Sequence, residues 1–167
     1  LPYFLFSATA GELADKYRKD VIIKVVKFCE MCIVVLAGLG FLLGSVTLIL
    51  LSLFMMGLHS TFFGPVKYSI IPEMLGEKDI ISGNALIESG TYIAILLGTV
   101  AGGLIIGAAG SEINIFGYTA EVSRYWFPCV IAVLAACGFI GSLYLREYPA
   151  VNPKLRITKN IFLGAWK

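Results

Sequence analysis

Long stretches without a charged side chain constrain this sequence more than any other feature. Asp, Glu, Lys and Arg are absent from residues 31–66, 89–111 and 125–145, although about a quarter of the residues in an average soluble domain are charged. Hydrophobic residues make up 58% of the chain and charged residues 14%. Because about 20 apolar residues cross a bilayer, we predict an integral membrane protein with an all-α, polytopic fold.

Glycine, proline and charged positions divide the chain into one partial and four complete membrane helices. Residues 1–10 are too few to span, so we interpret them as the end of a helix that began upstream. The complete helices are predicted at about 21–43, 46–63, 82 to 107–110, and 125–145. Lys24, Lys27 and Glu30 would then reach from the first turns to the interface. Proline lacks a backbone donor, so Gly64-Pro65 is predicted to end the second complete helix.

Lys and Arg indicate the orientation, since cytoplasmic loops are enriched in them. Of the 13 Lys and Arg residues, all but Arg124 fall on one side of the predicted helices, so the first loop and the tail are predicted to be cytoplasmic. Residues 1–146 are predicted to form the partial transmembrane bundle, and residues 147–167 a cytoplasmic linker. Apolar residues recur at helical spacing in this linker, so an amphipathic helix at the membrane interface is the alternative prediction. The net charge of +2 gives no basic field for nucleic acid.

Residues 11–20 carry Gly-Glu-Leu-Ala-Asp-Lys-Tyr-Arg-Lys-Asp between two apolar stretches. A small residue permits close helix approach, and Asp15 can bind an opposing Arg or the positive end of a helix, so this segment is predicted to latch one conformation. It resembles the GxLADRxGRR loop between the second and third helices of major facilitator superfamily transporters. The resemblance implies a conformational role for the matching residues Gly11, Asp15, Lys16 and Lys19. Arg18 and Asp20 stand where the family has a glycine and a basic residue.

Small residues recur every four positions in the predicted 82–110 helix. This stripe is predicted to pack against another helix, and its glycines are Gly90, Gly98, Gly102 and the adjacent Gly103. Residues 98–103 also resemble the fifth-helix motif of facilitator-type exporters, with Thr99 in place of a proline.

Two further blocks are more specific: Phe-Gly-Pro-Val-Lys-Tyr-Ser-Ile-Ile-Pro-Glu at 63–73 and Gly-Asn-Ala-Leu-Ile-Glu-Ser at 83–89. They resemble bacterial lysophospholipid transporters, over essentially the whole chain. The resemblance implies that the chain is a fragment of the N-terminal half of such a transporter, covering about its second to sixth helices. Lys67 matches the lysine of the Pro-x-Lys-Tyr block. A cation there could bind a phosphate, or it could lie at the interface and only help to set the orientation of the helices in the membrane. Glu88 is expected to pair with Lys67 or a cationic headgroup, or to make a helix-end contact.

The resemblance implies movement of lysophosphatidylethanolamine to the inner leaflet of the bacterial inner membrane for reacylation. Implied partners are membrane lipids, the lysophospholipid substrate, the remaining transporter half and a fused phospholipid acyltransferase. The alternatives are a proton-coupled drug or metabolite exporter, or the membrane portion of such an acyltransferase. No catalytic, metal-binding or cofactor motif is found in the sequence, so the chain is predicted to be non-enzymatic. The single histidine, His59, is interpreted as a hydrogen-bonded helix contact, with a proton relay as the alternative.

Overall fold

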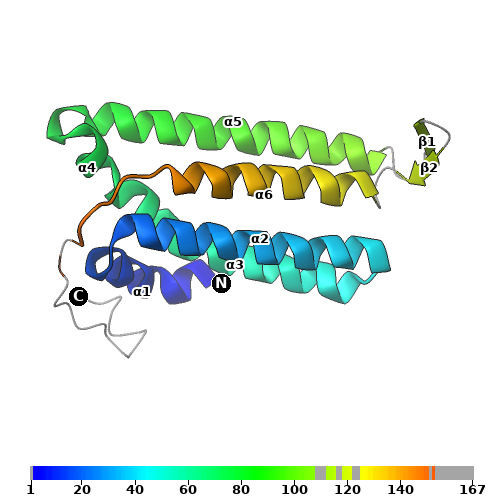
Figure 1. Ribbon diagram of the computed structural model, residues 1–167, viewed down its shortest axis with the longest axis horizontal. Coiled ribbons are helices and arrows are strands. Elements are labelled where there is room, and N and C mark those ends of the chain that lie inside the picture. The colour runs from blue at the N-terminus through cyan, green and yellow to red at the C-terminus, as the bar shows by residue number, and fades with distance from the viewer. Residues whose placement is uncertain (1, 108–111, 116–117, 122–124, 151, 153–167) are drawn as a thin grey trace.

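The computed structural model describes residues 2–107, 112–115, 118–121, 125–150 and 152 (Figure 1). The helices in chain order are α1 (Pro2–Lys16), α2 (Lys19–Leu43), α3 (Val46–Ser69), α4 (Ile71–Leu75), the short 3-10 helix η1 (Glu77–Asp79), α5 (Ile80–Gly107) and α6 (Phe127–Leu143). One antiparallel hairpin, β1 (Glu112–Ile115) and β2 (Tyr118–Glu121), connects α5 to α6, with Glu112 opposite Glu121. The all-α polytopic fold is confirmed. The predicted interfacial helix of the tail lies outside the described residues.

Among the described residues, three segments are long and apolar enough to cross a membrane: α2, the α3–α4 segment Val46–Leu75, and α5 over Ile80–Ile105. Helix α6 has 17 residues, which at 1.5 Å per residue is about 26 Å, close to the thickness of a bilayer core. The turn between α2 and α3 follows the prediction, because Gly44 ends α2 with φ 63° and the Ser45 side chain accepts a hydrogen bond from the Leu48 amide at the start of α3.

The predicted end of the second complete helix at Gly64-Pro65 is wrong. Helix α3 contains Pro65 and continues to Ser69. The four residues beyond the proline include Val66, which is 1% exposed, and Ile70 follows as the buried cap of the helix. Both belong to the core cluster, so tertiary packing outweighs the local cost of a proline within a helix.

The predicted end of the first, partial helix at residue 10 is also wrong. Helix α1 runs on to Lys16, and only Tyr17 and Arg18 separate it from α2. Ala10 and Ala14 are each 1% exposed, and α1 packs on α3. Small side chains on that face let the two helices approach closely, and this contact extends the helix past the charged residues.

Helix α2 lies at the centre of the bundle, in contact with both α3 and α6. Helix α5 contacts α4 and η1, and Figure 1 shows the β-hairpin at one end of the molecule. The α1–α2 turn, α4, the start of α5 and the segment after α6 gather at the other end. We call this second end the turn end.

The core is small and lies near the turn end. It consists of Ala14, Ile23, Val66 and Ile70, with partly buried apolar side chains around them. The outer surfaces of α2, α3, α5 and α6 instead carry exposed Leu, Ile, Val and Phe, as expected for surfaces that face lipid. Buried hydroxyls donate to carbonyls of their own helix, as Thr61 does to Gly57 at 2.9 Å, so no water is required to satisfy them.

Candidate functional site

A cavity of about 260 Å³ lies between α2, α3, α5 and α6, near the turn end. Two of the lining side chains are cations, Lys27 and Lys67, and the others are apolar or small: Ile23, Phe63, Ile70, Ile87, Gly138, Gly141, Ser142 and Leu145. We call this site the lysine cavity. Two ammonium groups beside apolar side chains form a site suited to an amphipathic anion, because an ammonium forms charge-assisted hydrogen bonds with the anionic group and the apolar walls accommodate the apolar part.

Lys67 reaches the lysine cavity from the last turn of α3, beyond Pro65. Its Nζ donates a hydrogen bond to Thr91 Oγ1 on α5 at 3.1 Å and lies 4.7 Å from the centroid of the Tyr68 ring. The Thr91 hydroxyl donates in turn to the Ile87 carbonyl at 2.7 Å, which leaves its lone pairs for the ammonium. The uncharged partner leaves the positive charge of Lys67 unneutralised.

Lys27 enters the lysine cavity from α2, eight residues and about 12 Å after its first residue. Its Nζ is 2.6 Å from Glu30 Oε2 and 4.9 Å from the centroid of the Phe63 ring. On α6, Gly138 makes room for it, since a Cβ at that position would lie 3.3 Å from the Nζ. Lys27 and Glu30 pair with each other, and their predicted reach to the interface stays a prediction. The sequence signal that could have indicated this pair is two opposite charges three residues apart in an apolar helix.

Glu88 lies on α5, directly after Ile87 of the lysine cavity, and is partly exposed. Among the described residues it forms no ion pair, and the Nζ of Lys67 bonds Thr91 instead. The expected pairing of Glu88 with Lys67 therefore has no counterpart here. Its expected role toward a cationic headgroup stays a prediction.

The glycine stripe of α5 packs against no other part of the described chain. A Cβ added at Gly90, Gly98, Gly102 or Gly103 would meet nothing within 4 Å. Packing of this stripe therefore stays a prediction about a contact outside the described residues.

Residues of the predicted latch are divided between two helices. Gly11, Asp15 and Lys16 lie on α1, and Lys19 is the first residue of α2. Lys19 is 2% exposed, donates to the Ser69 carbonyl at 2.6 Å and pairs with Glu73, so it ties the start of α2 to the end of α3 and to α4. The Asp15 carbonyl accepts a hydrogen bond from the Asn152 amide at 2.8 Å.

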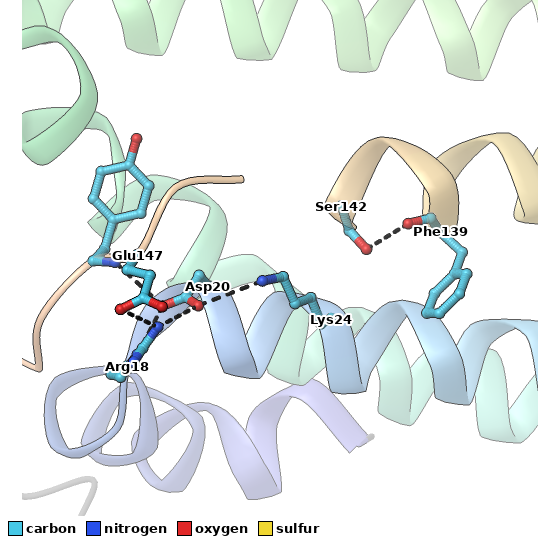
Figure 2. A network of polar contacts seen from close by, with 7 residues as sticks. Arg18, Asp20, Lys24, Phe139, Ser142 and Glu147 are labelled. Carbon is cyan, nitrogen blue, oxygen red and sulfur yellow. Dashed lines mark hydrogen bonds and ion pairs between the residues drawn. The ribbon is translucent and has the colours of Figure 1, made fainter. Parts of the chain in front are cut away.

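The strongest polar network at the turn end centres on Asp20, which is 1% exposed (Figure 2). Its carboxylate accepts hydrogen bonds from Arg18 at 3.0 and 3.2 Å and from the Tyr148 amide at 3.2 Å, and it lies 3.6 Å from the Lys24 Nζ. Arg18 also pairs with Glu147 at 3.1 Å. We call these five residues the Asp20 cluster.

The Asp20 cluster joins the α1–α2 turn to the segment that follows α6. The hydrogen bonds to Asp20, and then those to Glu147, raise the pKa of the Arg18 guanidinium above its ordinary value. Arg18 therefore stays cationic at any physiological pH. Sequence reasoning did not assign Asp20 to the latch, because the family pattern has a basic residue there, and no local signal places Tyr148 against it 128 residues later.

A second cavity, of about 490 Å³, lies between α1, α2 and α3. Its walls are almost wholly apolar, contributed by residues such as Leu13, Val25 and Phe62, and the imidazole of His59 is among them. We call it the apolar cavity.

Several known proteins are similar to this chain, although no solved structure matches it. A lysophospholipid transporter of Serratia proteamaculans is 26% identical over 98% of this chain and 36% of its own length. Lysophospholipid transporters of Escherichia coli and Shigella boydii are 28% identical over 90% of this chain and 33% of their own. The chain thus spans about a third of the length of the curated relatives it matches.

A protein family also matches most of the chain. Residues 1–138 match the family described as transmembrane secretion effector, and in the part of the chain that the structure describes three helices are long and apolar enough to cross a membrane. The chain therefore belongs to the transmembrane secretion effector family of the major facilitator superfamily.

Proposed function

We propose that this chain forms part of a transporter that moves a lysophospholipid across the membrane. The observation that carries the proposal is the lysine cavity, in which Lys27 and Lys67 lie against apolar walls. A lysophospholipid has one phosphate and one acyl chain. The phosphate is an anion with strong acceptor oxygens, which an ammonium binds by charge-assisted hydrogen bonds, and the acyl chain requires only apolar surface.

Lys67 is the first phosphate ligand in this proposal. Its present partner, the Thr91 hydroxyl, is neutral, so a phosphate oxygen can replace that hydroxyl without separating an ion pair. Glu88, partly exposed on the same helix as Thr91, is proposed to meet the ammonium of an ethanolamine headgroup. Lysophosphatidylethanolamine is the preferred candidate substrate, and transfer to the inner leaflet for reacylation is the proposed direction.

The proposed setting is the bacterial inner membrane, with the turn end on the cytoplasmic side. The described helices supply one wall of a pathway, and a second half of the transporter would supply the other as the halves alternate. The glycine stripe of α5 is proposed to pack against that remaining half, and a phospholipid acyltransferase is the proposed consumer of the product. The chain itself is proposed to be non-enzymatic.

A conformational role is proposed for the α1–α2 turn. Gly11, Asp15, Lys16 and Lys19 lie at the junction that the Asp20 cluster closes. Several of its contacts join segments far apart in the sequence, so they can form in one state of the transporter and separate in another.

The test is uptake of labelled lysophosphatidylethanolamine by spheroplasts that express the full-length parent protein. Lys67→Ala is expected to lower uptake by at least tenfold at equal membrane abundance, since losing one hydrogen bond between charged groups costs about 1.5–3 kcal/mol. Lys67→Arg should recover part of the uptake. Lys78→Ala is the matched control, because Lys78 is exposed in η1 and lies outside the cavity. Wild-type protein that moves no lysophospholipid would refute the proposal.

The second candidate function is a proton-coupled exporter of a drug or metabolite. It is favoured by one observation, a group of titratable side chains inside the membrane-spanning helices, Lys27, Glu30 and His59. A substrate screen with and without a proton gradient separates the two functions. Export of another solute, driven by the gradient and without lysophospholipid uptake, would favour this second candidate.

A further inference from the structure

Three titratable side chains meet between α2 and α3, well inside the membrane-spanning segments. Glu30 Oε2 is 2.6 Å from the Nζ of Lys27 and 3.7 Å from the Nε2 of His59. The His59 side chain is only 7% exposed, and its ring stacks on Phe63, with centroids 6.1 Å apart and an interplanar angle of 14°. Ionisable groups in such positions are rare, and when present they commonly serve transport.

The hydrogen bonding of His59 is incomplete. Its Nε2 is buried and has no hydrogen-bond partner, although Glu30 Oε2 lies 3.7 Å away. In the neutral imidazole tautomer that carries its proton on Nδ1, the Nε2 lone pair faces the Glu30 carboxylate, which is also an acceptor. One added proton on Nε2 converts this contact into a charge-assisted hydrogen bond.

The neighbouring helices add few groups that could take up this proton. Helix α2 contributes Lys27 and Glu30, and it also carries Cys29 and Cys32. Helix α1 has its charged residues, Glu12, Asp15 and Lys16, at its C-terminal end. On α6 the titratable side chains are Cys129 and Cys137, and the nearest other charge on α3 is Lys67, two turns beyond His59.

Lys27, Glu30 and His59 connect the two cavities. His59 lines the apolar cavity, Lys27 lines the lysine cavity, and Glu30 contacts both residues. With His59 neutral, the negative charge of Glu30 offsets the positive charge of Lys27. A proton on His59 gives Glu30 a second cation, which leaves the Lys27 ammonium less neutralised and free to hold an anion.

We propose that Glu30 and His59 form a proton-binding site coupled to the binding of a lipid phosphate at Lys27. This inference rests on the proposed function, because the phosphate is that of the lysophospholipid. The three side chains together have no net charge before the proton binds, one positive charge after it, and none again once a phosphate monoanion binds. Charge is costly in a membrane interior, so the proton and the phosphate each favour the other's binding, and the coupling is reciprocal.

The first experiment measures binding of labelled lysophosphatidylethanolamine to the purified full-length parent protein in lipid nanodiscs, at pH 5.5 and pH 8.0. We expect binding roughly tenfold tighter at pH 5.5, within the range typical of coupled sites. His59→Gln should bind with the weaker affinity at both pH values. Glu30→Gln should bind tightly at both, because nothing then neutralises Lys27. Lys78→Ala, outside both cavities, should behave as wild type. Wild-type affinity that does not change with pH, or a His59→Gln variant that retains the change, would overturn the proposal.

The second experiment does not depend on the lipid. Nuclear magnetic resonance of labelled histidine, with His59 assigned by its absence in His59→Gln, follows protonation of the imidazole. The signal should titrate between pH 5 and pH 9, with a midpoint that changes in Glu30→Gln. An imidazole that does not titrate, or that titrates identically in both proteins, contradicts a shared proton. A normal titration with no lysophospholipid binding at any pH would refute the proposed function and the coupling, while leaving the proton-binding site in place.

Discussion

The buried carboxylate of Asp20 should contribute more to stability than the exposed charges that pair with it at the turn end. Asp20 is 1% exposed, whereas its partner Arg18 is 43% exposed and Glu147 is 80% exposed. Asp20→Ala leaves the Tyr148 amide without its acceptor and removes the negative charge that faces Arg18 and Lys24. Breaking a buried pair costs about 3–5 kcal/mol, and because Arg18 can regain water we expect the lower end, about 3 kcal/mol.

Two further substitutions separate the contributions to this figure. Asp20→Asn retains an oxygen that can accept from the Tyr148 amide, so it should cost about half as much, roughly 1.5 kcal/mol. Glu147→Gln removes an exposed charge and should cost at most about 0.5 kcal/mol. The assay is unfolding of the full-length parent in mixed micelles of increasing denaturing-detergent fraction, monitored by fluorescence. About 3 kcal/mol corresponds to a change of roughly 100-fold in the unfolding equilibrium.

The Asp20 cluster is also proposed to latch one conformation. Asp20→Asn should therefore increase labelling of a cysteine introduced at position 148, because the segment after α6 detaches more often from the α1–α2 turn. If Asp20→Ala and Glu147→Gln change stability equally, the argument from burial is refuted. If labelling at position 148 is the same in Asp20→Asn and wild type, the cluster does not act as a latch.

Two glycine positions yield further expectations. Gly40→Ala should destabilise the protein by about 1–3 kcal/mol, because its Cβ would lie 2.9 Å from Ile49 Cγ1 and 3.1 Å from the Ile49 amide nitrogen. Gly141→Ala on α6, where a Cβ meets nothing within 4 Å, is the control, and equal stability of the two variants would contradict the packing. Gly138→Val should displace the Lys27 ammonium, because even a Cβ at this position would lie 3.3 Å from the Lys27 Nζ. Lysophospholipid uptake should therefore fall with little loss of folded protein. Unchanged uptake would show that this side of the lysine cavity is not used.

Much of the fold could be predicted because the membrane imposes it. A bilayer admits only segments whose backbone groups bond internally, so charge-free stretches and turn residues located α2, α5, α6 and the start of α3 to within a few residues. The turn at Gly44-Ser45 was predictable for the same reason, since glycine and a capping serine act locally.

The site was less predictable, since its residues come from separate helices. Lys67 could be selected from its sequence block, but its bond to Thr91 requires α5 to lie beside α3. Lys27 and Glu30 were assigned to the interface because nothing in the sequence around them indicates a cavity between α2 and α6.

Hydropathy, glycine and proline act over a few residues at a time, so they were enough to predict a membrane-embedded helical bundle and the positions of most of its helices. Long-range packing accounts for the rest: α3 continues through Pro65, α1 extends to Lys16, and Asp20 binds a backbone amide from beyond α6. Those outcomes depend on burial and on charge pairing between segments distant in the chain. Such energies exist only once the helices have packed.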